Sequence, residues 1–289
     1  MIKISSISNL KDVLNRYELY PKKRWGQNFL IDHNIIDKII LTADINEDDY
    51  VIEIGPGLGA LTQELAKNAK GVLAIDIDEN LKLPLQEVLD GNNNCKLLFA
   101  DILKVDLEAE LRKAFGLNET PAYKVCANIP YNITTPIIFN LLENSSNLNS
   151  ATLMMQKEVA TRILAEPNNK DYGRLTLMVA LYAQTKLGFN VSRNCFYPKP
   201  QVDSYVLSLI PNEVPAVIID DVEELKAFIK NAFQKRRKTI LNICSSFFDV
   251  DKNVCKPLLV DLDINPLHRP ENLTLVEFAV IHNTFLIRG

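Results

Sequence analysis

The stretch Asn128-Ile129-Pro130-Tyr131 carries the residue types needed to hold a flat ring that bears an exocyclic amine. It follows the apolar run at 123–127, which predicts a buried strand ending at Asn128. Pro130 favours an extended Ile129, so that the Ile129 carbonyl turns outward beside the Asn128 amide oxygen. Two neighbouring acceptors suit an amine such as that of adenine, and Tyr131 offers a face for base stacking. An ordinary Asn-Pro turn is the alternative for these four residues taken alone.

A glycine-rich turn closer to the N-terminus predicts a site for an adenosine-containing ligand. A short apolar strand at 50–54 leads directly into Gly55-Pro56-Gly57-Leu58-Gly59-Ala60, and a helical pattern follows. Glycines there allow a tight turn and a close approach of the backbone to a ligand at the helix N-terminus. The next predicted strand, at 72–75, ends at Asp76, which is 21 residues beyond Gly55 (76 − 55). An acid at that distance is placed to hydrogen-bond a ribose diol.

Three successive predicted strands end in a polar side chain, namely Asp76, Asp101 and Asn128. Asp101 follows the strand at 96–100 and is suited to accept a hydrogen bond from the adenine amine of a cofactor. Strands that alternate with helices predict an α/β fold with an open sheet. Because the carboxyl ends of parallel strands meet at one edge of such a sheet, these side chains predict a shared ligand crevice.

The glycine turn does not by itself choose the cofactor. Gly55-x-Gly57-x-x-Ala60 also matches the dinucleotide pattern of NAD-binding oxidoreductases. Glu53 stands two residues before Gly55 and completes an E-x-G-x-G-x-G run, which is typical of S-adenosylmethionine enzymes. The run favours S-adenosylmethionine, and an NAD enzyme is the alternative that shares the turn and Asp76.

Two further segments have the composition of ligand contacts. Residues 22–30 carry the single Trp of the chain and two amides, Gln27 and Asn28, which predict contacts to a small ligand. Residues 195–204 form a loop stiffened by two prolines, from which Phe196 or Tyr197 is predicted to project against a flipped base. The alternatives are a tie between the N-terminus and the core, and a rigid hairpin linker.

Composition sets the frame for these motifs. The 289 residues are 47% hydrophobic and 24% charged, which predicts a globular protein with one large and one smaller domain. A linker-like break at 211–215 separates residues 1–211 from residues 212–289, where short helices are expected. The five cysteines form no CxxC pair, and the N-terminus lacks a signal-peptide pattern. We therefore expect a cytoplasmic protein with reduced thiols, no metal site and no membrane span.

The net charge of −4 argues against a surface that attracts nucleic acid everywhere, but it allows local basic sites. Basic residues cluster at 22–24 and at Lys235-Arg236-Arg237-Lys238, and they are in excess between 151 and 210. We expect the cluster at 235–238 to contact RNA phosphates. An ordinary solvated face is the alternative for each cluster.

Taken in order, the motifs closely resemble those of the ribosomal RNA adenine dimethyltransferases of the KsgA type. The matching segments are Gln27-Asn28-Phe29-Leu30, Glu53-Ile54-Gly55-Pro56-Gly57-Leu58-Gly59, Asp101, Asn128-Ile129-Pro130-Tyr131-Asn132-Ile133, Phe196-Tyr197-Pro198-Lys199-Pro200-Gln201-Val202-Asp203-Ser204 and Arg236-Arg237-Lys238-Thr239. Asp76 departs from the family pattern because many members carry Glu there. The shorter side chain should still reach one ribose hydroxyl.

The resemblance implies a class I S-adenosylmethionine-dependent methyltransferase fold, a Rossmann-like doubly wound sheet, with a small all-helical C-terminal domain. It implies S-adenosyl-L-methionine as the cofactor. The implied substrate is the pair of adjacent adenosines near the 3′ end of 16S (small-subunit) rRNA, dimethylated on their exocyclic amines within a pre-30S or 30S particle during ribosome biogenesis. We expect the enzyme to act as a monomer.

The residues expected in the site follow from the same motifs. The catalytic set is Asn128, Ile129, Pro130, Tyr131 and Phe196, and the cofactor-binding set is Asn28, Leu30, Gly55, Asp76, Asp101 and Asn128. Asp203-Ser204 and the form of residues 128–133 favour the small-subunit enzyme over the large-subunit sister enzyme that confers macrolide resistance. A non-catalytic rRNA-binding assembly factor is a further alternative, which would keep the basic clusters without needing Asn128.

Overall fold

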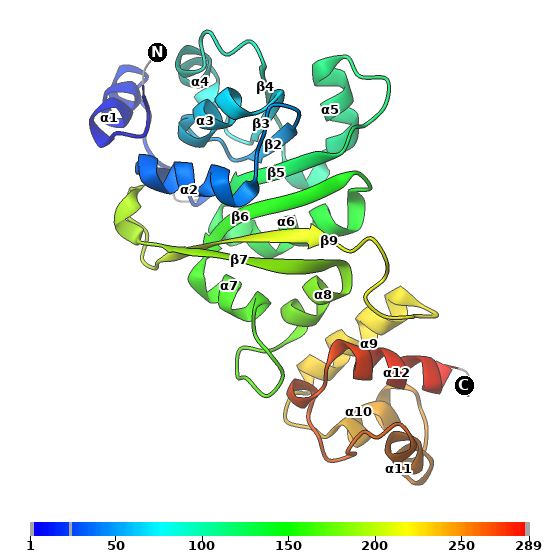
Figure 1. The fold of residues 1–289 in the computed structure, drawn as a ribbon. Coiled ribbons are helices and arrows are strands. Elements are labelled where there is room, and N and C mark those ends of the chain that lie inside the picture. Colours follow the sequence, from blue (N-terminus) through cyan, green and yellow to red (C-terminus); the bar gives the residue numbers. More distant parts are fainter. Residues whose placement is uncertain (1–2, 23–24, 287–289) are drawn as a thin grey trace. The chain divides into compact units, whose positions relative to one another are not determined.

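The computed structural model describes residues 3–22 and 25–286. Lys23 and Arg24, from the basic cluster at 22–24, lie outside the described residues. The chain folds as two units (Figure 1). The first unit comprises Met1–Ala160 and Thr185–Pro211, and the second comprises Thr161–Gln184 and Asn212–Gly289.

The segment Thr161–Gln184 belongs to the second unit, whereas the sequence-based boundary placed it in the first domain with the rest of residues 1–211. Its apolar side chains account for the difference. Tyr172 and Leu177 are buried in one hydrophobic cluster with the C-terminal helices, and the Tyr172 hydroxyl donates to Leu273 O at 2.7 Å. The second unit is therefore assembled from two separate stretches of chain, which one linear boundary does not capture.

Within the described residues, the first unit is built on a seven-stranded sheet in the order β4-β3-β2-β5-β6-β9-β7. The neighbours from β4 to β6 run parallel, and β9 pairs antiparallel with β6. The strands are β2 (Tyr50–Ile54), β3 (Gly71–Asp76), β4 (Cys95–Phe99), β5 (Tyr123–Asn128), β6 (Leu148–Gln156), β7 (Ala183–Val191) and β9 (Ser204–Pro211). The parallel strands are nearly continuous apolar runs because helices cover both faces of the sheet.

The crossover helices determine where this sheet opens for a ligand. They are α3 (Ala60–Asn68), α4 (Lys82–Val88), α5 (Leu107–Phe115) and α6 (Thr134–Asn144). The chain moves outward from β2 to β3 and β4, and then returns to β5 on the other side of β2 (Figure 1). Right-handed crossovers consequently put α3 and α4 on one face of the sheet and α5 and α6 on the other. The point of reversal lies between β2 and β5, where open α/β sheets bind ligands.

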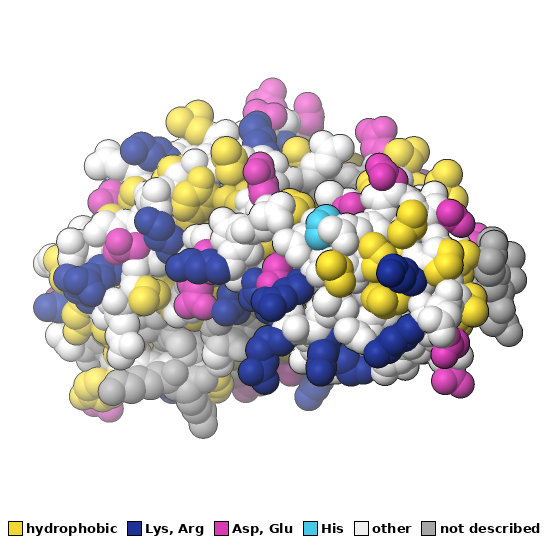
Figure 2. All heavy atoms as spheres, turned by 90° about the horizontal axis from the view of Figure 1, so that it is seen from below, with side chains coloured by type: hydrophobic (Ala, Val, Ile, Leu, Met, Phe, Trp, Pro, Cys, Tyr) yellow, Lys and Arg dark blue, Asp and Glu magenta, His cyan; other side chains and the backbone are white. Residues whose placement is uncertain are grey.

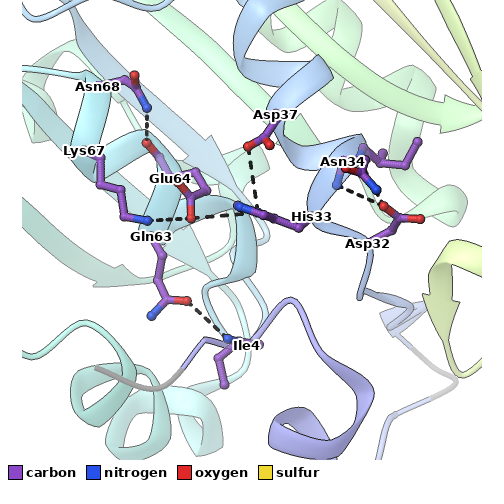
Figure 3. Close-up of polar contacts among 10 residues, drawn as sticks. Ile4, Asp32, His33, Asn34, Asp37, Gln63, Glu64, Lys67 and Asn68 are labelled. Atoms are coloured by element: carbon purple, nitrogen blue, oxygen red, sulfur yellow. Dashed lines mark hydrogen bonds and ion pairs between the residues drawn. The ribbon is translucent and has the colours of Figure 1, made fainter.

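The N-terminal segment packs onto the first unit through α1 (Ile7–Arg16) and α2 (His33–Ala43). Asp32 caps α2 by accepting hydrogen bonds from the N–H groups of Asn34 and Ile35. The Ile4 N–H donates to Gln63 Oε1 on α3 at 3.3 Å, and His33 Nδ1 lies 4.0 Å from Glu64 Oε1 (Figure 3). These contacts tie the start of the chain to the helix that follows the glycine turn.

A second, two-stranded sheet joins distant parts of the chain. It pairs β1 (Phe29–Leu30) antiparallel with β8 (Phe196–Tyr197), with Leu30 opposite Phe196. The loop at 195–204 lies between β7 and β9, which are neighbours in the large sheet. The loop between them therefore carries β8 back to the N-terminal segment.

The second unit is helical in the part of the chain that the structure describes. Its helices are α8 (Arg174–Tyr182), α9 (Val222–Gln234), α10 (Ile240–Phe247), α11 (Lys252–Asp261) and α12 (Leu275–Leu286), and α7 (Lys157–Ile163) leads into it. Phe228 is at the centre of its core, with ring centroids of Phe248 and Phe278 at 5.0 and 5.5 Å. None of the described helices is both long and apolar enough to cross a lipid bilayer.

Candidate active site at the carboxyl ends of the strands

A cavity opens at the carboxyl ends of β2, β3 and β5, which is the reversal point of the sheet. Its wall brings together nine of the residues that the sequence singled out, from five separate segments. They are Asn28, Leu30, Gly55, Asp76, Asp101, Asn128, Ile129, Pro130 and Tyr131. The predicted shared crevice is therefore present in the fold.

The glycine turn lines this cavity. Its backbone has a conformation that residues with a side chain rarely adopt. Gly55 and Gly57 have φ values of +72° and +57°. A Cβ atom on Gly57 would lie 2.9 Å from Cδ1 of Phe29, so the turn and β1 pack directly against each other. The Gly57 N–H donates to Asp76 Oδ2 at 3.3 Å. The turn thus sets the position of the acid at the end of the neighbouring strand.

Two buried carboxyls, Asp76 and Glu53, lie next to the glycine turn. Asp76 is 9% exposed, and burial raises its pKa to about 6, although hydrogen bonds from the N–H groups of Asp78 and Gly57 oppose the shift. Glu53 is 2% exposed, and burial, with a smaller effect of the Asp76 charge, raises its pKa to about 8. Glu53 Oε2 has no hydrogen-bond partner among the described residues.

The acidic and basic side chains on the cavity wall are all carboxyls, and that of Glu53 is neutral at pH 7 because burial raises its pKa to about 8. Glu53, Asp76 and Asp101 contribute carboxyls, and no Lys, Arg or His lines the cavity among the residues that the structure describes. A ligand that carries positive charge suits this wall, whereas the doubly negative pyrophosphate of NAD would face carboxyls without a compensating cation. In the same described part of the chain, no group of three or more His, Cys, Asp or Glu side chains is arranged to hold a metal ion.

The stretch Asn128-Ile129-Pro130-Tyr131, which we call the Asn128 platform, lies at the end of β5, and several hydrogen bonds fix its geometry. The Asn128 Nδ2 group donates to Asn28 O at 3.1 Å, so Oδ1 is the amide atom left to accept from a ligand. The Ile129 N–H donates to Met154 O at 3.0 Å, which holds the adjoining peptide. The Tyr131 hydroxyl and Ser204 Oγ are 2.7 Å apart, and this hydrogen bond fixes the ring. The structure thus brings Asn128, Ile129 and Tyr131 together on the cavity wall, and their role toward a base stays a prediction.

Phe196 does not project from its loop, and that expectation is wrong. Its side chain is 3% exposed and belongs to the hydrophobic core of the first unit. The pairing of β8 with β1 turns it inward opposite Leu30, and it is not part of the cavity wall. Tyr197, its partly buried neighbour, has Lys11 Nζ 5.1 Å from its ring centroid. Tyr131, and not Phe196, therefore lies on the cavity wall, together with Trp25 and Phe29.

The basic cluster at 235–238 belongs to the second unit, in the turn between α9 and α10. Arg237 and Lys238 are exposed. Arg236 is partly engaged, because its Nη2 donates to Lys170 O at 2.9 Å and its Nε lies 3.4 Å from Glu271 Oε2. The space-filling view shows Lys and Arg side chains in several places on the visible face, most densely in its lower middle (Figure 2). This uneven distribution agrees with a protein of net negative charge that has local basic sites.

Sequence reasoning missed Asp78, which lies behind the cavity wall. Its carboxylate binds Lys22 Nζ at 2.8 Å and Gln27 Nε2 at 3.1 Å. The signal available in the sequence was the second acid of Asp76-Ile77-Asp78, which alternation places on the same side of the chain as Asp76. Its partners lie more than fifty positions earlier in the sequence, so their pairing was not visible before the fold.

The fold is that of a class I methyltransferase. Residues 20–276 match the family model described as ribosomal RNA adenine dimethylase, and the chain belongs to that family. A ribosomal RNA small subunit methyltransferase A from Lactococcus lactis is 41% identical over 285 residues, which cover 98% of this chain and 96% of that protein. The protein of the same name from Moorella thermoacetica is 44% identical over 268 residues, covering 92% and 93%.

Solved structures agree with this assignment. A dimethyladenosine transferase from Plasmodium falciparum superposes with a TM-score of 0.74 at 30% identity, covering 90% of this chain and 98% of that one. The 23S rRNA methyltransferase ErmE superposes with a TM-score of 0.68 at 26% identity, covering 89% and 99%. The family resemblance inferred from the motifs is thereby confirmed.

Proposed function

We propose that this chain uses S-adenosyl-L-methionine to dimethylate the exocyclic amines of two adjacent adenosines near the 3′ end of small-subunit rRNA. The observation that carries the proposal is a single cavity that joins the Gly55 turn to the Asn128 platform. One part of the cavity suits a nucleoside cofactor, and the other presents acceptors and an aromatic face to a base.

The described residues fit S-adenosylmethionine, which is a cation at its sulfur and carries an ammonium group. Asp76 and Asp101 on the cavity wall suit those charges, and no Lys, Arg or His among the described residues lines the cavity. Asp76 would bind the ribose and Asp101 the adenine amine, while Asn28 and the Leu30 backbone close the far side. When bound there, the cofactor supplies an electrophilic methyl group.

The platform residues prepare the target amine. The lone pair of adenine's exocyclic nitrogen is delocalised into the ring, which makes it a poor nucleophile. Hydrogen bonds from the amine to Asn128 Oδ1 and the Ile129 carbonyl favour the pyramidal nitrogen of the transition state. Tyr131, held by Ser204, stacks on the base and keeps the nitrogen in line. No general base is required, because the methylated nitrogen is acidic enough to release its proton to water.

The comparison of relatives favours the small-subunit substrate. The two proteins named for the small subunit are 41% and 44% identical to this chain, and the 23S rRNA methyltransferase is 26% identical. We infer that the chain acts as a monomer, in the cytoplasm, on a pre-30S or 30S particle. Its net charge of −4 gives little general attraction to RNA, so recognition should depend on a shaped rRNA surface.

Nucleoside analysis after reaction with unmethylated small subunits tests the proposal. We expect dimethyladenosine at two neighbouring positions, four methyl groups in all, and no labelling of naked large-subunit rRNA. Monomethyladenosine still has one N–H for Asn128 Oδ1 or the Ile129 carbonyl and can react again, whereas the dimethyl product has none and loses both contacts. Equal labelling of large-subunit rRNA would favour the sister enzyme. Subunit binding without any methyl transfer would favour a non-catalytic assembly factor.

A further inference from the structure

Asp78 fastens the segment that closes one side of the cavity. Its side chain is almost fully buried, at 1% exposure. The carboxylate binds Lys22 Nζ at 2.8 Å and Gln27 Nε2 at 3.1 Å, and Gln27 Oε1 accepts from the Lys22 N–H at 2.8 Å. The three residues therefore form a closed set of contacts, in which one buried charge holds two side chains from the N-terminal segment.

Asp78 is also linked to the proposed ribose-binding acid. Its N–H donates to Asp76 Oδ1 at 2.9 Å, so both carboxyls are fixed by one short stretch of backbone after β3. Burial alone would raise the pKa of Asp78, but hydrogen bonds from Lys22, Asn80 and Gln27 outweigh it and hold that pKa below its usual value. The residue is thus a carboxylate at neutral pH and can hold Lys22 by a charge-assisted bond.

The same N-terminal segment reaches the target platform at its other end. Residues 25–30 all line the cavity. Asn28 Nδ2 donates to Gly26 O at 2.9 Å, which shapes the turn, and Asn28 O accepts from Asn128 Nδ2 at 3.1 Å. The segment therefore spans the distance between Asp78, beside the cofactor region, and Asn128, beside the substrate region.

We propose that Asp78 is a positioning residue that keeps residues 25–30 closed over the cofactor region of the cavity. The inference rests on the proposed use of S-adenosylmethionine. Asp78 touches neither cofactor nor substrate, and it acts by raising the fraction of molecules in which the segment is closed. An apparent dissociation constant equals the intrinsic one divided by the competent fraction. A change that lowers this fraction to about one tenth of its wild-type value raises the apparent dissociation constant about tenfold. This corresponds to a loss of about 1.4 kcal/mol of binding free energy.

Calorimetry with S-adenosylhomocysteine, the cofactor without its methyl group, measures the effect without any turnover. We expect Asp78→Asn, which keeps the side-chain shape and removes the charge, to weaken binding about tenfold. Trp25, the single Trp of the chain, lies in the segment with Lys22 Nζ 4.5 Å from its ring centroid. Its fluorescence should be more strongly quenched by acrylamide in the variant than in the wild type, since an opened segment admits the quencher.

Glu87→Gln is the matched control. Glu87 also binds the N-terminal segment, through Arg16 Nη1 at 2.7 Å and the Tyr17 hydroxyl at 2.5 Å, but it is outside the cavity. This variant should leave both the affinity and the quenching of Trp25 unchanged. An equal loss of affinity in Glu87→Gln and Asp78→Asn would mean that any loosening of the N-terminal segment suffices, and it would overturn the specific role of Asp78.

A second variant, Lys22→Met, keeps the inference testable if Asp78→Asn does not fold. Lys22 is 27% exposed, and Asp78 keeps hydrogen bonds from Gln27 and Asn80 when Lys22 is replaced. It should weaken binding and expose Trp25 in the same direction, and the double variant should show less than the sum of both effects. Unchanged affinity and quenching in both single variants would overturn the role of Asp78. Failure of the wild type to bind S-adenosylhomocysteine would instead refute the proposed cofactor.

Discussion

The nitrogen and the oxygen of the Asn128 side-chain amide have different roles. The nitrogen holds Asn28 O, and the oxygen is left for the target amine. Asp76 shows a comparable division, because each of its carboxyl oxygens accepts one backbone N–H and retains a further acceptor site for a ligand. The roles of single residues in this site thus follow from which of their atoms are already engaged.

Asn128→Ala should lower the rate of methyl transfer by a hundredfold or more, since it removes one contact that strengthens in the transition state. Affinity for S-adenosylhomocysteine should fall by no more than about fivefold, because the lost hydrogen bond to Asn28 is worth about 1 kcal/mol. Transfer of labelled methyl groups and calorimetry measure the two quantities. Asn128→Asp, which retains an acceptor, is the control. Near-normal turnover of the Asn128→Ala variant would show that Asn128 does not take part in methyl transfer.

Glu53 predicts a pH-dependent effect on stability. Its pKa is about 8 in the folded chain against an ordinary 4.5, so between these values the unfolded chain loses the proton and the folded chain keeps it. The free energy of unfolding therefore declines as pH rises from 4.5 to 8. Glu53→Gln removes this decline. We expect its melting temperature relative to wild type to be higher at pH 8 than at pH 5, with exposed Glu119→Gln showing no such change.

At the scale of elements, the glycine turn and β1 position each other. The Cβ atom missing from Gly57 makes room for the ring of Phe29. β1 is in turn paired with β8, so the cofactor turn, the N-terminal segment and the loop between β7 and β9 form one packed set. A substitution in the turn should consequently displace β1 and with it the part of the cavity wall that β1 forms.

Gly57→Ala and Gly116→Ala separate backbone strain from this packing. Both glycines have positive φ, +57° and +65°, so both alanines cost about 1–2 kcal/mol of strain. A Cβ at Gly57 meets Phe29 at 2.9 Å, whereas one at Gly116 has no atom within 4 Å. Thermal unfolding should show a larger loss for Gly57→Ala, and only that variant should bind S-adenosylhomocysteine more weakly. Similar affinity in both variants would show that the turn tolerates the displacement of β1.

Patterns among neighbouring residues predicted most of the strands and helices. The two wrong predictions, for Phe196 and for the domain boundary, depend on contacts between residues far apart in the sequence. The strands β3 and β5 are apolar runs that end in Asp76 and Asn128, and Asp32 precedes α2 as a cap, so both features could be read from neighbouring residues. The burial of Phe196 depends on its pairing with Leu30, far away in the sequence. The grouping of Thr161–Gln184 with the second unit depends in the same way on packing against C-terminal helices. A single sequence contains no local signal for either contact.

For the whole molecule, charge is distributed unevenly. The net charge is −4, the cavity wall of the first unit carries three carboxyls, and the second unit carries the cluster at 235–238. The acidic cavity favours a cationic cofactor, while the cluster offers an anion-binding surface elsewhere in the chain. The proposed cofactor and the rRNA phosphates would thus be attracted by different groups of side chains.

Replacing Lys235, Arg236, Arg237 and Lys238 by Gln should weaken small-subunit binding and reduce its salt dependence. Each lost phosphate contact lowers the slope of log affinity against log salt by roughly 0.7–0.9. Arg236 should contribute least, since Lys170 O and Glu271 already engage it. A filter-binding series over several salt concentrations measures the slope. The control replaces four exposed lysines of the first unit, which are Lys38, Lys67, Lys82 and Lys113. Equal slopes for the two variants would show that the cluster at 235–238 is an ordinary solvated surface.

The pairing of β1 with β8 also sets the order in which the protein is completed during synthesis. Phe29 and its partner Tyr197 are 168 positions apart (197 − 29). At the usual rates of translation, about 5–20 residues per second, β1 waits roughly 10–30 s for its partner strand to be made. Until then Leu30, which forms part of the cavity wall, lacks the strand that holds it. The cofactor cavity is therefore among the last parts of the first unit to be finished, although its glycine turn is among the first to be synthesised.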